Sequence, residues 1–397
     1  MRPLLLCEIR TEWTDLSDEK VTNRRIESWE QVGRRVAAAR LAAGFTQEGL
    51  ANRLGLHRSA VSRIEQGERQ LDVLELVRLA SALGRSADWF LSEPPVHVAS
   101  HRRESSDSRE VQRLEDELEA AARDVELLVD IGELAEPDVS RLGYEDLEGP
   151  EQAQAAADEA RALLAVDGGP VWDLPDRVAS VGLHAFSVSL GSDVIDGGYV
   201  RLNGVGVAVV NGDADPGRRR FSLAHELAHH LLADEYSAEF GVGETREDRE
   251  GLLNVFAIHL LMPRQDVLAR WQELRDDGHD ERSAAIVLAS EFRVSWSAAC
   301  NQLRNLGALS GQQRSTLEVR RPTSADYIEL GLSYATELDP PQLPAAFARA
   351  ALRAYRHNKI GRQRALELLR GTLEADELPE ADAVPIDGLR SELSGPP

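Results

Sequence analysis

Two histidines four residues apart, with a glutamate directly after the first, are the residues of this sequence best suited to chemistry. They are His225, Glu226 and His229, within Phe221-Ser-Leu-Ala-His-Glu-Leu-Ala-His-His230. On a helix, residues four apart differ by about 40° in direction, so both imidazoles leave the same face and can reach one metal ion. This H-E-x-x-H pattern is typical of zinc peptidases, in which the glutamate takes a proton from a water molecule whose pKa the ion lowers. The alternative is a helix with surface histidines.

A catalytic zinc ion needs a third protein ligand and one open position. The acidic residues downstream supply the candidates Glu244, Glu247, Asp248 and Glu250. A second helix is expected from Glu250 to Met262, closed by Pro263, and it carries His259. We name Glu226 and His259 as candidate catalytic residues, His259 as a stabiliser of the oxyanion or as a group behind the ligands; the alternative is a partly buried histidine with no role. His230 points about 100° away from His229, which places it behind the ligands or on the surface.

The segment from about 151 to 310 resembles the ImmA/IrrE family of metallopeptidases. The similarity lies in Arg219-Arg-Phe-Ser-Leu-Ala-His-Glu-Leu-Ala-His229 and then in Asn254-Val-Phe-Ala-Ile-His-Leu-Leu-Met-Pro263. The resemblance implies Glu250, four residues before the asparagine, as the third ligand. It also implies a cytoplasmic enzyme that relieves transcriptional repression by cutting a repressor. Zn²⁺ is the expected cofactor, with Mn²⁺ as an alternative. Ala228 and Leu253 replace the family's usual glycine and alanine, which leaves the ligand set intact.

A helix-turn-helix pattern occupies residues 31–67. Thr46 to Gly55 is the expected first helix of the pair, with Thr46 as its N-cap, and Leu56 to Gln66 is the second. Between Arg24 and Arg69 the sequence has nine arginines and five glutamates, a local charge of +4 in a chain of −23, which fits a surface that faces phosphates. The expected DNA contacts are Gln47, His57, Arg58, Ser59, Ser62 and Arg63. The alternative is a small protein-binding domain with a basic face.

Residues 29–91 resemble the xenobiotic-response-element-type (XRE) repressor family, which has the λ-repressor-like fold. The match includes Arg40-Leu-Ala-Ala-Gly-Phe-Thr-Gln-Glu48 and Val61-Ser-Arg-Ile-Glu-Gln-Gly-Glu68. The resemblance implies a helical head that binds operator DNA, with its second motif helix in the major groove.

Length and composition predict the number of domains and the cellular compartment. A chain of 397 residues is expected to form two or three domains. The two cysteines, Cys7 and Cys300, match no cysteine-based zinc spacing and fit a reducing cytoplasm. No apolar run approaches the roughly 18 residues of a membrane span, so we expect a soluble cytoplasmic protein with no membrane partner. The expected fold class is multidomain: an all-α helix-turn-helix head, an α+β zincin-like metallopeptidase domain and a small helical C-terminal segment.

The expected domain limits follow the changes in composition and pattern. They are a flexible arm at 1–25, the XRE-type DNA-binding domain at 26–95, an acidic helical linker at 96–150, the metallopeptidase domain at 151–310, and a helical segment with an acidic tail at 311–397. Strands are expected around 182–190 and 198–210, the clearest being Val205 to Val210. Two helices are expected at 344–356 and 360–373, either as a small core or as a docking surface.

An a/d stripe runs through the acidic linker. Residues 104–161 hold 19 acidic residues against 5 arginines. The stripe consists of Val111, Leu114, Leu118, Ala121, Val125 and Leu128. Such a stripe either pairs with a second chain as a coiled coil or packs on neighbouring parts of its own chain.

Taken together, the motifs predict a DNA-binding transcriptional regulator that carries a zinc endopeptidase domain. We expect it to bind operator DNA as a homodimer. It would cleave a repressor or another regulatory protein, in its own chain or a partner, in response to a signal such as stress. Two alternatives stay open: a zinc-dependent sensor or scaffold without turnover, and an antitoxin-like member of a two-gene module. The intact Glu226 argues against a scaffold, and an enzyme whose cleft is covered by the acidic helix or the C-terminal segment is also compatible.

Overall fold

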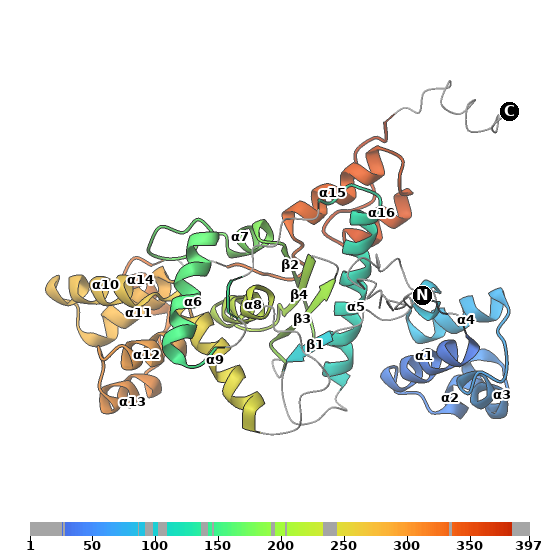
Figure 1. Cartoon of the computed structure of the whole chain (residues 1–397), viewed down its shortest axis with the longest axis horizontal. Helices are drawn as coiled ribbons and strands as arrows, with labels where there is room; N and C mark the ends of the chain where they lie inside the picture. The colour runs from blue at the N-terminus through green and yellow to red at the C-terminus, as the bar shows by residue number, and fades with distance from the viewer. Residues whose placement is uncertain are drawn as a thin grey trace, which may run out of the picture. The chain divides into compact units, whose positions relative to one another are not determined.

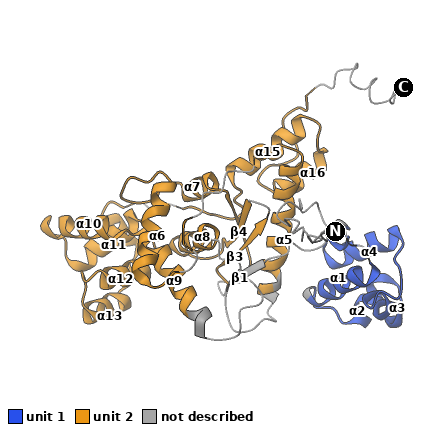
Figure 2. Ribbon diagram, viewed as in Figure 1, with its two compact units in different colours: residues 1–94 blue, residues 95–397 orange. Residues whose placement is uncertain are grey.

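The computed structural model describes residue 26 and residues 28–85, 87–91, 98–101, 109–135, 142–144, 147–191, 195–202, 205–232, 244–332 and 336–382 (Figure 1). The chain divides into two compact units, residues 1–94 and 95–397 (Figure 2). The expected arm at 1–25 and the tail beyond residue 382 lie outside the described residues. Across the described ranges, none of the helices has both the length and the apolarity that crossing a membrane requires.

The first unit is helical, as expected. Its elements are α1 (Trp29–Ala42), α2 (Gln47–Leu54), α3 (Arg58–Glu65), α4 (Val73–Leu83) and a 3-10 turn, η2 (Asp88–Phe90). The Thr46 hydroxyl accepts a hydrogen bond from the Gly49 N–H at 3.0 Å, which confirms the predicted N-cap of α2. Gly55 ends α2 with a φ of 68°, in the left-handed region that glycine adopts cheaply. The helices enclose one core, to which α2 contributes Leu50 and α3 contributes Ile64.

The second unit combines helices with a small sheet. Its strands are β1 (Val98–His101), β2 (Leu183–Val188), β3 (Gly197–Leu202) and β4 (Val205–Asn211). Its helices are α5 (Arg109–Asp130), α6 (Pro150–Leu163), α7 (Leu174–Ser180), α8 (Pro216–Leu231), α9 (Glu244–Leu261), α10 (Arg264–Asp276), α11 (Glu281–Glu291), α12 (Trp296–Asn305), α13 (Gly311–Val319), α14 (Ser324–Glu329), α15 (Ala345–Arg356) and α16 (Arg362–Leu368).

The sheet has the strand order β1-β3-β4-β2. β2 runs parallel to β4, whereas β1 and β3 run antiparallel to their neighbours. Strand β1 lies inside residues 96–150, where sequence analysis expects a helical linker, and this expectation is wrong for 98–101. Four residues are too few to show the alternating pattern of a strand, so the strand is evident only from its pairing with β3.

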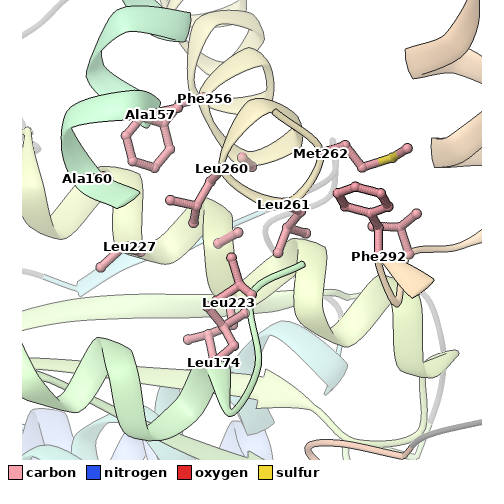
Figure 3. Close-up of a cluster of buried hydrophobic side chains, with 14 of the residues drawn as sticks. Ala157, Ala160, Leu174, Leu223, Leu227, Phe256, Leu260, Leu261, Met262 and Phe292 are labelled. Carbon is pink, nitrogen blue, oxygen red and sulfur yellow. The ribbon is translucent and has the colours of Figure 1, made fainter. Parts of the chain in front are cut away.

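Successive side chains of the strands point to opposite faces of the sheet, so the second unit has two cores, one on each face. On one face, Ala185, Ala208 and Val210 pack under α6, α8 and α9. Figure 3 shows side chains of these helices gathered in that core, among them Leu223 and Leu227 of α8 and Phe256 and Leu260 of α9. Because α8 and α9 are packed on each other and α8 on the sheet, the chemistry-bearing helix has rigid support on both sides.

The opposite face of the sheet is covered by α5, α15 and α16. Five residues of the predicted a/d stripe, Leu114, Leu118, Ala121, Val125 and Leu128, have at most 1% of their surface exposed and pack in this core, and Val111 lies at its border. The stripe therefore contacts the chain's own neighbours, which was one of its two interpretations, and it is not available for a coiled coil. The two predicted C-terminal helices are present as α15 and α16, and they contribute Phe347 and Leu368 to the same core.

Candidate metal centre

The predicted H-E-x-x-H helix is α8. Asp215 caps it by accepting a hydrogen bond from the Gly217 N–H, and Pro216 occupies the first turn, where its missing N–H costs nothing. Most of its polar side chains are buried, including Glu226, with 1% of its surface exposed, and His229, also 1%. A helix that buries charge and imidazole in this way must give them partners, because an unpaired buried polar group is costly.

Three of the predicted site residues come together between α8 and α9. The ligand-type atoms of His225, His229 and Glu250 all lie within 4.8 Å of one another. The His225 Nε2 to Glu250 Oε2 distance is 3.3 Å. Asp248, another third-ligand candidate, is exposed and is not part of this group. The side chains of the remaining two candidates, Glu244 and Glu247, lie outside the described residues.

Asn254 orients the first histidine. Its Oδ1 lies 3.1 Å from His225 Nδ1, and since an amide oxygen accepts, the imidazole donates from Nδ1. This leaves the Nε2 lone pair directed to Glu250 and to any ion between them. Metal-binding histidines commonly donate their second N–H in this way, which fixes the tautomer and the ring orientation.

The donor set fits a divalent ion of the zinc type. Two imidazole nitrogens and one carboxylate oxygen are a common catalytic zinc set, which leaves one position open. With metal–ligand distances of about 2.0–2.1 Å, two tetrahedral ligands lie about 3.3 Å apart, close to the spacing of His225 and Glu250. The same donors also suit other transition metals, so the geometry supports a metal site without naming the ion.

The second predicted catalytic residue, His259, lies about two and a half turns after Glu250 on α9. It is buried, and its Nδ1 is 3.5 Å from Gln302 Nε2 of α12. Burial, with a smaller effect of Arg264, lowers the pKa of His259 to about 4. The ring is therefore neutral near pH 7, and any help to an oxyanion would come from its N–H rather than from a positive charge. His259 is not part of the three-residue group, and its catalytic role stays a prediction.

The predicted DNA-contacting side chains lie on α3 and at its start. His57, Arg58, Ser59 and Arg63 are exposed and Ser62 is half-buried. Gln47 instead donates a 2.8 Å hydrogen bond to the Glu65 carboxylate, which also pairs with Arg40. The exposed residues are accessible to a ligand, and their contacts with DNA stay a prediction. Gln47 instead ties α2 to α3.

Each of the two units matches a known protein family. Residues 181–304 match the IrrE N-terminal-like domain of peptidase family M78. Residues 36–90 match the helix-turn-helix family. The chain thus carries a DNA-binding helix-turn-helix domain followed by a metallopeptidase-type domain, in the order predicted. No curated protein matches the chain.

Within the IrrE-like domain (residues 181–304), His230 is buried and not on the surface. Its Nε2 donates to the Val181 carbonyl at 2.9 Å, so its Nδ1 accepts from the Tyr199 hydroxyl at 3.1 Å. The Tyr199 ring also stacks on His229, with centroids 6.4 Å apart and an angle of 12° between the planes. Gly206 of β4 leaves room for this arrangement, because a Cβ there would lie 2.4 Å from His230 Nδ1. The role of Tyr199 was not predicted, since nothing in its local sequence marks it.

The start of α8 is tied to a segment beyond the IrrE-like domain. The Arg220 guanidinium pairs with Glu337 and donates to the Val171 carbonyl at 2.6 Å, while Arg219 pairs with Asp339. Glu337 also pairs with Arg293 at 2.6 Å. Burial lowers the pKa of Arg220, an effect that Glu337 opposes. The pairs Arg220–Glu337 and Arg219–Asp339 join residues more than 100 positions apart, which is why the sequence pattern did not reveal them.

Proposed function

We propose that the chain is a DNA-binding regulator whose second unit hydrolyses a peptide bond in a regulatory protein, with a zinc ion held by His225, His229 and Glu250. The observation that carries the proposal is the convergence of these three side chains, with Asn254 orienting His225. The pairing of this site with a helix-turn-helix domain favours a transcriptional repressor as the substrate. The repressor is either a partner protein or this chain itself.

Each of the residues around the site would have a separate role in hydrolysis. When bound, a zinc ion polarises a water molecule and the substrate carbonyl. Glu226 would take the proton from the attacking water and return it to the leaving amine, as a general base and then a general acid. Asn254 and Tyr199 would keep the two imidazoles in place, the first by a hydrogen bond and the second by stacking. The burial of Glu226 limits competing water around its carboxylate.

The decisive experiment compares proteomes of cells that carry the wild type or Glu226→Gln. The substitution keeps the size of the side chain and the three proposed ligands but removes the base. We expect one or a few proteins to be cut in wild-type cells and intact in the variant. Metal analysis of the two purified proteins provides the control, because both should hold about one equivalent of zinc if only the base is lost.

The competing function is a metal-dependent sensor or scaffold without turnover. It would be favoured if both proteins bind zinc and no cleavage difference appears under any inducing condition. Glu250→Gln then becomes the informative variant, because it should weaken metal binding. In a scaffold, that variant should change regulation, while Glu226→Gln should leave regulation unchanged.

The DNA-binding half of the proposal is tested separately. Chromatin pull-down of the full chain should enrich a short operator sequence, and Arg58→Ala should reduce that enrichment. We retain the homodimer as a prediction that light scattering with and without operator DNA can test. The buried stripe of α5 cannot form its interface, so the interface would lie elsewhere.

A further inference from the structure

The edge of the sheet beside the metal centre is occupied by the segment that joins the two units. Strand β1 starts at Val98, shortly after the first unit ends at residue 94. It pairs antiparallel with β3 in the register Val98 to Val200, Ala99 to Tyr199, Ser100 to Gly198 and His101 to Gly197. Neither β1 nor the residues before it belong to the matched IrrE-like domain, which supplies the other three strands.

This register places β1 next to the proposed metal ligands. Tyr199, the partner of Ala99, stacks on His229 and bonds to His230. Helix α8, which carries both histidines, packs on β3 and β4. Neighbouring strands lie about 4.8 Å apart, so the backbone of β1 is one strand spacing beyond the strand that contacts a ligand. Figure 1 shows β4, β3 and β1 following one another beside α8.

Without β1, strand β3 would be the edge of the sheet and a natural binding surface for a peptide. The N–H and C=O groups that β1 leaves unpaired could then bind any extended segment through main-chain hydrogen bonds, largely independent of sequence. A peptide that is to be cut must run extended past the metal centre, and the β3 edge provides that course. One edge can hold only one strand, so β1 and an incoming peptide exclude each other.

We propose that residues 98–101 are a built-in occupant of the substrate edge of β3, which competes with the protein substrate and holds the peptidase latent until the strand is released. This inference rests on the proposed function, because it gives the metal centre a regulator. The substrate class that it implies is an extended, unfolded segment that adds antiparallel to β3. Its release would expose the edge without any change at the metal ligands themselves.

The test breaks the strand without altering the site. The variant Val98→Gly, Ala99→Pro, Ser100→Gly, His101→Pro keeps the length of the segment, while proline removes ladder donors and glycine weakens strands. The matched control, Val98→Ile with Ser100→Thr, keeps or raises strand propensity. Both sets are made in the full-length chain carrying Glu226→Gln, so that no probe is consumed.

The probe is a fluorescent synthetic peptide with the sequence of residues 96–103, titrated by anisotropy. A tethered strand acts at an effective concentration of about 1 mM, so a probe with an intrinsic Kd of about 0.1 mM should bind about tenfold more weakly when β1 is intact. We therefore expect about tenfold tighter binding to the broken-strand variant than to the control. Hydrogen exchange at residues 197–202 should be faster in the variant, and the peptide should slow it again.

The remaining outcomes contradict the proposal. Equal affinity in variant and control would mean that β1 does not occupy the peptide edge. Weaker binding to the variant would mean that the peptide adds to β1 itself. Failure of the proposed function is a separate result: if the chain with an intact Glu226 and a broken strand cleaves no protein, but the peptide still binds as expected, the edge is a regulated peptide site without turnover.

Discussion

The buried ion pair between Arg220 and Glu337 allows a direct test of how α8, the helix of the H-E-x-x-H motif, is held in place. Arg220 has 1% of its surface exposed, and Glu337 is its carboxylate partner. Replacing Glu337 with alanine would leave the guanidinium in a dry site with only the Val171 carbonyl as an acceptor among the described contacts. The pair joins the start of α8 to the segment before α15, so its loss should loosen the helix that carries His225 and His229.

The expected cost is large because the charge that remains is buried. Removing one partner of a buried pair typically costs about 3–5 kcal/mol. Arg293, the other partner of Glu337, is more exposed and stacks on Trp172 with 4.1 Å between the guanidinium carbon and the ring centroid, so it should add little. Glu337→Gln keeps an acceptor and should cost less than Glu337→Ala. Asp382→Ala removes an exposed partner of Arg356 and is the matched control, at about 0–1 kcal/mol.

Hydrogen exchange is the suitable assay, because two compact units are not expected to unfold in one transition. Amides of α8 should lose protection by about 3 kcal/mol or more in Glu337→Ala, while amides of α1 to α4 should be unchanged. A loss below about 1 kcal/mol, similar to that of Asp382→Ala, would refute the reasoning. It would mean that Arg220 finds water or another acceptor once Glu337 is gone.

Three other predictions concern the metal site, pH and DNA. Asn254→Ala should weaken zinc binding by about 10- to 100-fold, measured by competition with a chelating dye, and unchanged affinity would contradict the orienting role of its bond to His225. His184 has no hydrogen-bond partner among the described residues at either ring nitrogen, and burial lowers its pKa from 6.5 to about 4. As the pH falls, the unfolded chain therefore binds a proton at His184 before the folded chain does. The free energy of unfolding should decrease by about 3 kcal/mol as the pH drops from 6.5 to 4. A His184→Leu variant should lack this decrease in denaturation experiments at different pH values. Arg58→Ala should cost about 1–3 kcal/mol of operator binding in anisotropy titrations, and an equal loss on unrelated DNA would indicate a phosphate contact instead.

The features that the sequence predicted well are local in the chain. The spacing of His225 and His229 fixes their common face on any helix, and Thr46 caps α2 through a bond to a residue three positions away. Glycines such as Gly55 mark helix ends because their backbone conformation is itself a local property. The existence and order of the DNA-binding and peptidase-type domains follow from such motifs.

The features that the sequence did not predict depend on contacts between distant segments. Strand β1 exists only because β3 offers it an edge, and Tyr199 reaches two histidines that lie about 30 residues further along. The stripe on α5 was ambiguous for a different reason. Spacings of three and four are equally suited to a coiled coil and to packing on a sheet, so only the presence of β3, β4 and α15 beneath the stripe decides the outcome.

The arrangement of the second unit also explains why a metal-binding motif alone does not define the site. The His225 ring is set by α9, the His229 ring by β3, and the start of α8 by Glu337 and Asp339. Of these supports, α9 and β3 belong to the matched segment, whereas Glu337 and Asp339 lie beyond it, and β1 precedes it. A truncated protein limited to residues 181–304 would retain the three side chains of the candidate metal centre and lose the carboxylate partner of buried Arg220. We therefore expect such a fragment to be unstable, and the regulation of the site to depend on segments that the motif does not contain.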